Sequence, residues 1–291
     1  MHNAKKDIKQ ILIISGKGGT GKTVLTGSFA VLSHRAVFAD CDVDASDLHL
    51  LLKPRLKEKH DFISGKKAII DKTRCIGCGR CVKICRFDAV SPTYEIDRIA
   101  CEGCGVCVFD CPAGAIDFVD NNCGQWYISD TASGPLVHAK LGIAEENSGK
   151  LVSTVKENAK KLAAEQAKEL ILIDGPPGIG CPVIASLAGV DLAVVVTEPT
   201  LSGISDMKRV IEVAGHFKIE SKVIINKYDI SRENTADIEK ILDKMKVELL
   251  GKLPFSKDIN DALVAGKPVI EYTDKPISKK IAGIWDKITD S

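Results

Sequence analysis

A glycine-rich loop near the start of the chain limits the possible folds more than any other feature. Residues 15–23 read Ser-Gly-Lys-Gly-Gly-Thr-Gly-Lys-Thr and follow the apolar run Ile11–Ile14. They satisfy G-x4-G-K-[ST], in which backbone amides and a helix N-terminus converge on phosphates. Lys22 is expected to approach the β- and γ-phosphates, and the Thr23 hydroxyl to ligate Mg²⁺. The phosphate site is therefore predicted to comprise Gly16, Gly18, Gly19, Thr20, Gly21, Lys22 and Thr23.

Short apolar runs alternate with longer helical patterns along most of the chain. The predicted strands are Ile11–Ile14, Ala36–Ala39, Leu170–Ile173, Leu192–Val196 and Val223–Ile225. The predicted helices are Lys22–His34, Leu151–Lys168, Ser202–Phe217 and Thr235–Lys246, with a short one at Ser46–Leu52 followed by a basic linker. Apolar strands alternating with helices are typical of βαβ units. The pattern predicts an α/β fold with a doubly wound, mostly parallel sheet.

Carboxylates follow two of these strands. Asp174 ends the run Leu170–Ile173, which is the pattern of an aspartate that holds Mg²⁺ beside a nucleotide. Asp40 and Asp42 follow the second strand, and Asp44 and Asp47 continue the acidic turn. For the last two, a helix-capping role is an equally good interpretation.

The cysteines form a local cassette, because eight of the eleven lie between Cys75 and Cys111. The spacing Cys-x2-Cys-x2-Cys-x3-Cys occurs twice, 26 residues apart. In ferredoxins, such a run gives three thiolates to one [4Fe-4S] cluster and the fourth to its neighbour. The predicted ligand sets are Cys75, Cys78, Cys81 and Cys111 for one cluster, and Cys101, Cys104, Cys107 and Cys85 for the other.

Zinc binding and disulfide bonds are the alternative interpretations of the cassette. A zinc-ribbon template fits Cys78, Cys81, Cys101 and Cys104 but leaves four cassette cysteines without a role, so iron–sulfur is favoured. The first run departs from the ferredoxin pattern by ending in Cys85-Arg86, where the second ends in Cys111-Pro112. The remaining Cys41, Cys123 and Cys181 are interpreted as buried packing residues.

The composition of the chain limits the kinds of partner that it is expected to bind. The 291 residues carry 40 basic and 39 acidic side chains, a net charge of +1 that gives no support to nucleic-acid or anionic-membrane binding. No apolar run reaches the roughly 18 residues of a membrane span, and the first residues lack a signal-peptide core. The apolar stripe of Ile277–Asp290 is interpreted as core packing rather than as a membrane anchor. Clustered cysteines without a leader favour a reducing cytoplasm.

Further residues relate the phosphate-loop pattern to one particular class of proteins. Lys17 is an extra lysine early in the loop, as in the deviant motif of the MinD/ParA/Mrp class of P-loop ATPases. With Asp40-x-Asp42 and Asp174-Gly-Pro-Pro-Gly, it makes the chain resemble that class, and the cassette resembles a ferredoxin domain inserted in some members. Segments 144–150 and 180–182 extend the match. The implied fold is a P-loop NTPase with an inserted 2[4Fe-4S] ferredoxin-like domain at 66–120, flanked by ATPase segments 1–65 and 121–291.

The resemblance also implies residue roles. Lys17 would reach the partner's phosphates across a nucleotide-sandwich dimer, Asp42 would orient the attacking water, and Asp40 would help hold Mg²⁺. Asn226 would contact adenine. Because Asn226-Lys227-Tyr228-Asp229 also reads N-K-x-D, a pattern of GTP-binding proteins, the choice of base stays open, with the resemblance favouring ATP.

Together these features predict an ATPase that couples MgATP turnover to delivery of electrons or metal clusters, as in metallocofactor or iron–sulfur assembly. The expected partners are a second copy or a related ATPase, in a nucleotide-dependent dimer, and a redox or assembly protein. The alternative is an ATP-gated dimerising or positioning protein whose clusters are structural.

Overall fold

The computed structural model describes residues 8–33, 35–142, 145 and 147–290. Its contacts divide the chain into two compact units. The sheet unit comprises residues 1–59, 126–140 and 148–291, and the cysteine-rich unit comprises residues 60–125 and 141–147. His34, at the end of the first predicted helix, lies outside the described residues.

Nine strands join in one sheet with the order β3-β4-β5-β2-β6-β1-β7-β8-β9. Their bounds are β1 Lys9–Ser15, β2 Ala36–Asp40, β3 Arg55–Ile70, β4 Ile116–Asp130, β5 Pro135–Leu141, β6 Leu170–Pro177, β7 Leu192–Thr197, β8 Glu220–Asn226 and β9 Glu248–Leu253. The pairs β1–β6, β1–β7, β2–β5, β2–β6, β7–β8 and β8–β9 are all parallel. The predicted doubly wound, mostly parallel sheet is confirmed in this part of the chain.

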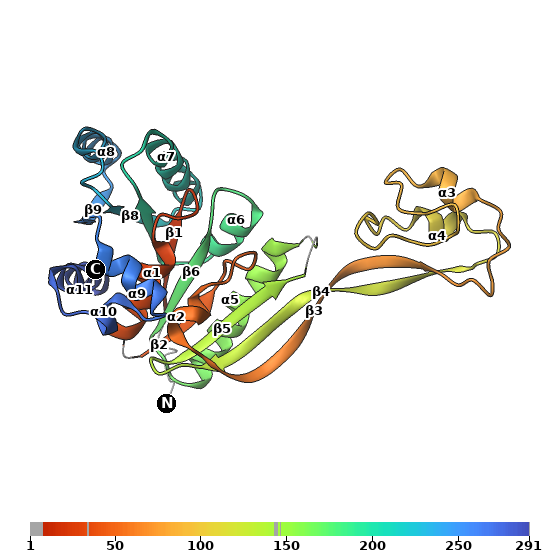
Figure 1. Ribbon diagram of the computed structural model, residues 1–291, viewed down its shortest axis with the longest axis horizontal. Helices are drawn as coiled ribbons and strands as arrows, with labels where there is room; N and C mark the ends of the chain where they lie inside the picture. Colours follow the sequence, from red (N-terminus) through yellow and green to blue (C-terminus); the bar gives the residue numbers. More distant parts are fainter. Residues whose placement is uncertain (1–7, 34, 143–144, 146, 291) are drawn as a thin grey trace, which may run out of the picture. The chain divides into compact units, whose positions relative to one another are not determined.

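Most helices of the sheet unit lie in the connections between its strands, and α9, α10 and α11 follow the last strand, β9 (Figure 1). They are α1 Lys22–Leu32, α2 Leu48–Leu52, α5 Ser148–Glu165, α6 Cys181–Leu187, α7 Leu201–His216, α8 Arg232–Met245, α9 Lys257–Val264, α10 Val269–Tyr272 and α11 Pro276–Thr289. The five predicted strands and the helices at 22–34, 151–168, 202–217 and 235–246 are confirmed to within a few residues. Side chains that alternate along a strand face opposite sides of a sheet. Ile11 and Ile13 of β1 join one core cluster with α1 and α11, whereas Leu12, equally buried, lies outside that cluster.

Helix α11 supplies much of that core. Ile277, Ile281, Ile284, Trp285 and Ile288 are all buried, and the Trp285 ring lies 5.2 Å from the ring of Phe29 on α1. The prediction that the C-terminal apolar stripe packs in the core is therefore confirmed. Within the described residues, no helix combines the length and apolarity needed to cross a membrane.

The predicted basic linker after the short helix is wrong, because residues 55–70 form the long strand β3. Its first six residues, Arg55–His60, are exposed or half-buried, and only Phe62, Ser64 and Ala68 are buried. An edge strand with solvent on most of its surface needs few apolar residues. Its sequence therefore lacks the apolar signal by which the central strands were found.

The cysteine-rich unit contains the end of β3, the start of β4 and two five-residue helices, α3 Arg80–Ile84 and α4 Val106–Asp110. Each helix follows a glycine with a left-handed backbone, Gly79 at φ 74° and Gly105 at φ 75°. The two sequence repeats thus adopt matching local structures. A small core that includes Ala68, Ala89, Cys101 and Ile116 lies within the unit.

Candidate nucleotide site and cysteine centres

The glycine-rich loop joins β1 to α1 at the carboxyl edge of the sheet. Two of its glycines have no room for a side chain. A Cβ on Gly16 would lie 2.3 Å from Cβ of Asp206, and a Cβ on Gly21, whose φ is +89°, would lie 2.5 Å from Nδ2 of Asn226. The loop is therefore closely held against the β7–α7 and β8–α8 regions, which keeps its shape ready for a ligand.

Lys22, Thr23 and Asp174 meet at the start of α1. The Lys22 ammonium lies 3.0 Å from Oδ1 of Asp174 and 3.7 Å from Oδ2 of Asp42, and Thr23 Oγ1 donates to Oδ2 of Asp174 at 2.7 Å. Burial lowers the pKa of Lys22, but the carboxylates of Asp174, Asp42 and Asp40 together raise it above its ordinary value. Lys22 therefore stays charged, as a phosphate ligand must.

Thr26 belongs to the same cluster, and the sequence analysis missed it. Its buried hydroxyl lies 2.8 Å from Oδ1 of Asp174 and 3.0 Å from the carbonyl oxygen of Lys22. One turn of α1 thus presents Lys22, Thr23 and Thr26 to one carboxylate. The signal was available in principle, because residues 22 and 26 are four apart and share a helix face.

Asp40 and Asp42 lie beside this cluster. Asp40 is fully buried and accepts hydrogen bonds from Ser46 Oγ at 2.7 Å, from the amide of Asp42 at 3.1 Å and from the amide of Leu48 at 3.2 Å. Burial and then the charge of Asp174 raise the pKa of Asp40 to about 7. Burial also raises the pKa of Asp42, against the opposing charge of Lys22. Three carboxylates with so little solvent favour a cation between them and a phosphate.

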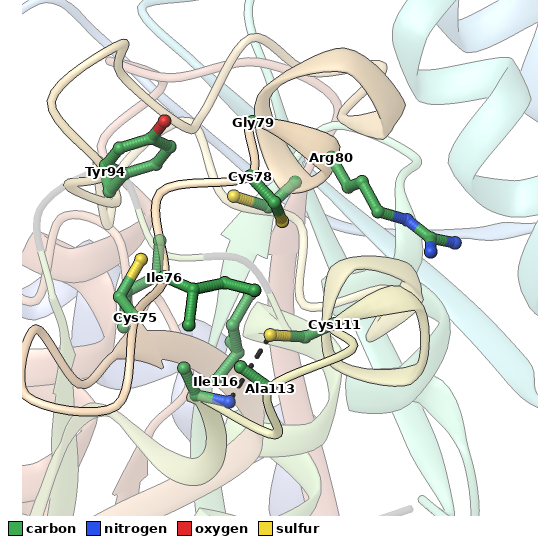
Figure 2. Close-up of a pocket in the computed structure, with 12 residues that line it drawn as sticks. Cys75, Ile76, Cys78, Gly79, Arg80, Tyr94, Cys111, Ala113 and Ile116 are labelled. Atoms are coloured by element: carbon green, nitrogen blue, oxygen red, sulfur yellow. Dashed lines mark hydrogen bonds between the residues drawn. The ribbon is translucent and has the colours of Figure 1, made fainter.

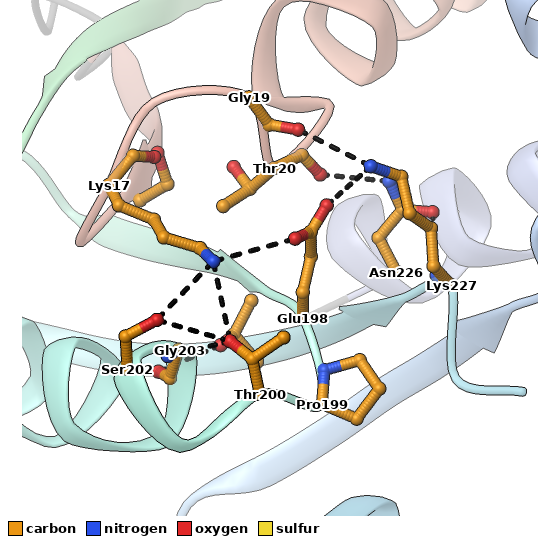
Figure 3. Close-up of polar contacts among 12 residues, drawn as sticks. Lys17, Gly19, Thr20, Glu198, Pro199, Thr200, Ser202, Gly203, Asn226 and Lys227 are labelled. Atoms are coloured by element: carbon orange, nitrogen blue, oxygen red, sulfur yellow. Dashed lines mark hydrogen bonds and ion pairs between the residues drawn. The ribbon is translucent and has the colours of Figure 1, made fainter. Parts of the chain in front are cut away.

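The Lys17 side chain contacts residues of its own chain (Figure 3). Its ammonium lies 3.6 Å from Oε2 of Glu198, 3.3 Å from Oγ1 of Thr200 and 3.5 Å from Oγ of Ser202. Glu198 also pairs with Lys227 at 2.5 Å. Sequence reasoning did not find Glu198, because a lone glutamate after a strand carries no distinguishing pattern.

Asn226 is buried at the end of β8. Its Nδ2 donates to the carbonyl oxygen of Thr20 at 2.8 Å, and its Oδ1 accepts from the amide of Lys227 at 3.0 Å (Figure 3). Asn226 therefore ties the phosphate loop to β8. Asp229, the last residue of the N-K-x-D pattern, accepts a hydrogen bond from the amide of Phe255 at 2.7 Å, so one of its oxygens serves the next loop.

The phosphate loop also has an unsatisfied polar group that suits a bound nucleotide with Mg²⁺. Thr20 Oγ1 is buried and has no hydrogen-bond partner among the described residues. A buried hydroxyl without a partner costs free energy, and a bound phosphate oxygen would supply the missing bond. Thr23, Asp40 and Asp174 offer the hydroxyl and carboxylate oxygens that Mg²⁺ prefers. The residues present are therefore suited to MgATP.

The eight cassette cysteines gather in two separate hollows of the cysteine-rich unit. The first has an empty volume of about 330 Å³, and Figure 2 shows Cys75, Cys78 and Cys111 around it. The second has an empty volume of about 310 Å³. Cys75, Cys78, Cys81 and Cys111 line the first, and Cys85, Cys101, Cys104 and Cys107 line the second. Each hollow thus receives three cysteines from one repeat and one from the other.

The surroundings of these thiols are mostly apolar. Burial raises the pKa of Cys81 and of Cys107. The amide of Ala115 donates to Sγ of Cys111 at 3.3 Å. Across the part of the chain that the structure describes, no three His, Cys, Asp or Glu side chains form a group that could hold a single metal ion, and the four thiols of each hollow are instead spread around its lining.

The three cysteines outside the cassette differ in burial. Cys41 and Cys123 are fully buried, as predicted, and Cys123 Sγ lies 2.9 Å from the carbonyl oxygen of Ser64. For Cys181 the prediction of a buried packing residue is wrong, because it is exposed at the first position of α6. A helix start next to the Gly178–Gly180 turn leaves that side chain without a covering element. In the segment 144–150, Ala144 and Glu146 lie outside the described residues.

Comparison with known proteins defines the family. The CobQ/CobB/MinD/ParA nucleotide-binding domain matches residues 11–269. An uncharacterised protein of Methanocaldococcus jannaschii is 34% identical over 287 residues, which cover 97% of both chains. An iron–sulfur cluster carrier protein of Pyrococcus furiosus is 26% identical over 42% of this chain and 45% of that protein. The structure of the septum site-determining protein MinD with Mg-ADP from Pyrococcus horikoshii superposes with a TM-score of 0.61 at 19% identity, covering 97% and 96% of the two chains.

Because the domain match spans most of the chain, the protein belongs to the CobQ/CobB/MinD/ParA family of nucleotide-binding proteins. It is an ATP-binding ATPase of the MinD/ParA class. The expected resemblance to that class is confirmed.

Proposed function

We propose that this ATPase couples MgATP binding and hydrolysis to the delivery of electrons or metal clusters to a partner protein, in metallocofactor or iron–sulfur assembly. The observation that carries the proposal is the sorting of the eight cassette cysteines into two hollows. In each, three ligands come from one run and the fourth comes from the other run, as crossed [4Fe-4S] ligation requires. The inserted ferredoxin-like domain, at residues 66–120, is part of this proposal.

The donor sets suit two [4Fe-4S] clusters. Four thiols line each hollow, and the positive-φ glycines Gly77 and Gly103 occupy equivalent turns between the first two cysteines of each run. Iron–sulfur clusters are held by four cysteine thiolates, and they supply one-electron chemistry when bound. The hollows are lined by apolar side chains such as Ile70 and Ile116 in the first and Val90 and Ile96 in the second, which shield a cluster from water.

At the nucleotide, water attacks the γ-phosphate in line with the leaving oxygen. Lys22 binds the β- and γ-phosphate oxygens and neutralises the charge that develops on them. Asp42, 3.7 Å from Lys22 and raised in pKa, orients the water. Thr23, Asp40 and Asp174 would hold Mg²⁺. Asn226 would contact the adenine base.

Hydrolysis would require a dimer in which the Lys17 side chain gives up its contacts within its own chain. In the structure, the ammonium of Lys17 lies against Glu198, Thr200 and Ser202, close to the phosphate loop but turned to α7. Reaching the phosphates of a second copy, or of a related ATPase, would break these contacts. ATP, which adds negative charge at the site, favours that exchange.

The relatives give the delivery role its support. One of them is named as an iron–sulfur cluster carrier, although the alignment with it spans less than half of either chain. A positioning protein is the second candidate, favoured by the likeness of the fold to MinD over 97% of this chain. In that case the clusters would be structural, and ATP would control dimerisation alone.

The deciding experiment uses the full chain, reconstituted anaerobically with iron and sulfide. EPR-monitored redox titration and chelator challenge are carried out with and without MgATP. The proposal expects two clusters per chain whose potential or lability to chelator changes with MgATP. In Asp42→Asn the change should persist with ATP bound but no longer reverse through hydrolysis. Glu212→Gln, an exposed glutamate on α7, is the matched control and should behave as the wild type.

Cluster properties that are identical in both nucleotide states would overturn delivery and leave the positioning role. Stoichiometric zinc without iron would overturn the clusters altogether.

A further inference from the structure

The two cysteine repeats differ in charge at equivalent positions. Residues 26 apart correspond, as Cys75 does to Cys101. At two such positions, a charged residue lines one hollow while its equivalent is apolar. Arg80 corresponds to Val106, and Glu102 corresponds to Ile76. Both differences act in the same electrostatic direction, because Arg80 lines the first hollow and Glu102 lines the second.

Each hollow therefore has one charged residue in its lining, and the two have opposite signs. All other lining residues are cysteines, apolar side chains, glycines or the uncharged Tyr94. Tyr94 donates from its hydroxyl to the carbonyl oxygen of Gly77 at 2.7 Å, so its polar atom is already engaged. The charges of Arg80 and Glu102 are the main electrostatic difference between the two linings.

Arg80 is held in place. Its Nε donates to Oδ2 of Asp110 at 3.0 Å, and its Nη2 donates to Oδ1 of the same carboxylate, a bidentate pair that joins α3 to α4. Arg80 belongs to the lining of the first hollow, whereas Asp110 does not. A bidentate pair is more rigid than a single contact. The charge of the guanidinium interacts with the thiols of Cys78 and Cys111, which line the same hollow.

Glu102 has no such compensation. It is exposed, and no ion pair to it occurs within the described residues. Lys67 donates a hydrogen bond to the carbonyl oxygen of Cys101, the residue before Glu102, at 2.6 Å. The carboxylate thus leaves an uncancelled negative charge at the rim of the second hollow.

We infer that the two iron–sulfur centres have different reduction potentials, the higher one in the first hollow. This inference rests on the proposed clusters. Adding an electron makes a cluster more negative, so a nearby guanidinium favours the reduced form and a carboxylate disfavours it. With clusters bound in both hollows, one electron from an external one-electron donor would reside mainly on the cluster beside Arg80 rather than on the cluster beside Glu102. The donor would be oxidised and that cluster reduced, with no bond made or broken.

The test is an EPR-monitored redox titration of the reconstituted full chain, with dithionite as the reductant. The wild type should titrate in two separate one-electron steps. Arg80→Gln should lower the higher potential, and Glu102→Gln should raise the lower one. Arg80→Lys keeps the charge and should leave the higher potential near its wild-type value, which separates charge from loss of the α3–α4 link. Glu95→Gln, an exposed glutamate outside both linings, should change neither step.

Cys78→Ala identifies the steps, because it should remove the one assigned to the first hollow. The inference is overturned if the wild type shows two clusters with one shared potential, or if Arg80→Gln and Glu102→Gln move neither step. A wild type that takes up no iron after reconstitution would overturn the clusters and this inference together. Two clusters with unequal potentials that ignore MgATP would overturn the coupling while leaving this inference standing.

Discussion

Asp174 illustrates how single residues decide the nucleotide site. It is fully buried and receives contacts from the ammonium of Lys22 and the hydroxyls of Thr23 and Thr26. A buried carboxylate is tolerated only when its oxygens are satisfied. We therefore expect Thr26 to act on Mg²⁺ binding through Asp174, as a positioning residue.

The first prediction concerns this contact. Thr26→Val keeps the shape of the side chain but removes the hydroxyl from Asp174 Oδ1. Because a hydrogen bond to a charged group is worth about 1.5 kcal/mol or more, MgATP should bind about tenfold more weakly. Isothermal titration with MgATP measures the change. Ser28→Ala is the control, since Ser28 is buried on the same helix and donates to the carbonyl oxygen of Val24. Equal affinities in wild type and Thr26→Val would contradict the role.

His138 predicts a pH dependence of stability. Burial, and then the neighbouring His49, lower its pKa to about 4. Its ring stacks on Tyr127 at 5.0 Å and on His49 at 6.1 Å, and its Nε2 lies 3.1 Å from Ser129 Oγ. With an unfolded pKa near 6.5, the unfolded chain binds the proton first. This contribution is therefore complete above about pH 6.5 and is lost as the pH falls towards 4.

Urea unfolding of the nucleotide-free protein at pH 7.5 and pH 5.5 tests this. In the wild type, each pH unit below 6.5 should lower the free energy of unfolding by roughly 1 kcal/mol. His138→Phe keeps a ring in the stack but has no group that titrates, so it should lack this pH-dependent contribution. Unfolding free energies that change equally with pH in both proteins would refute the assignment.

Helix α11 shows what decides stability at the level of elements. Its apolar stripe was recognised from helical spacing, but its partner, the ring of Phe29 on α1, is 256 residues earlier in the chain. Trp285→Ala should destabilise the protein by about 3–5 kcal/mol, because it empties a buried site against several elements. Trp285→Phe keeps a ring there and should cost less than about 2 kcal/mol. Thermal or urea unfolding measures both. A small loss in the alanine variant would mean that α11 is peripheral.

The strand β3 shows where pattern reasoning fails for an element. The central strands β1, β6 and β7 are buried on both faces, and their apolar runs identified them. β3 reads as a charged linker because most of its side chains face solvent. Its strand conformation comes from pairing at the sheet edge, which depends on residues distant in sequence.

At the level of the whole molecule, the crossed arrangement of the cysteines makes a separate prediction. Cys111→Ala lies in the second run but should abolish the centre of the first hollow, and Cys85→Ala should abolish that of the second. Each variant should fall from about eight irons to about four per chain after anaerobic reconstitution.

Double cysteine variants identify which cysteines serve the same centre. Combining Cys111→Ala with Cys78→Ala should cause no further iron loss, whereas combining it with Cys104→Ala should remove the remaining irons. Cys181→Ala, exposed and outside both linings, is the control and should keep all of its iron. If Cys111→Ala and Cys104→Ala affected one and the same centre, the crossed ligation would be wrong.

The sequence by itself determined the phosphate loop, the central strands and the spacing of the eight cysteines, because these depend on neighbours in the chain: a strand, a glycine turn and a helix start. Tertiary structure alone decided that Glu198 holds Lys17, that Thr26 supports Asp174 and that Arg80 and Glu102 line different hollows. It also left Cys181 exposed, contrary to expectation. The physical reason is that charge pairing and burial depend on distances between residues far apart in sequence, and no local pattern encodes those distances.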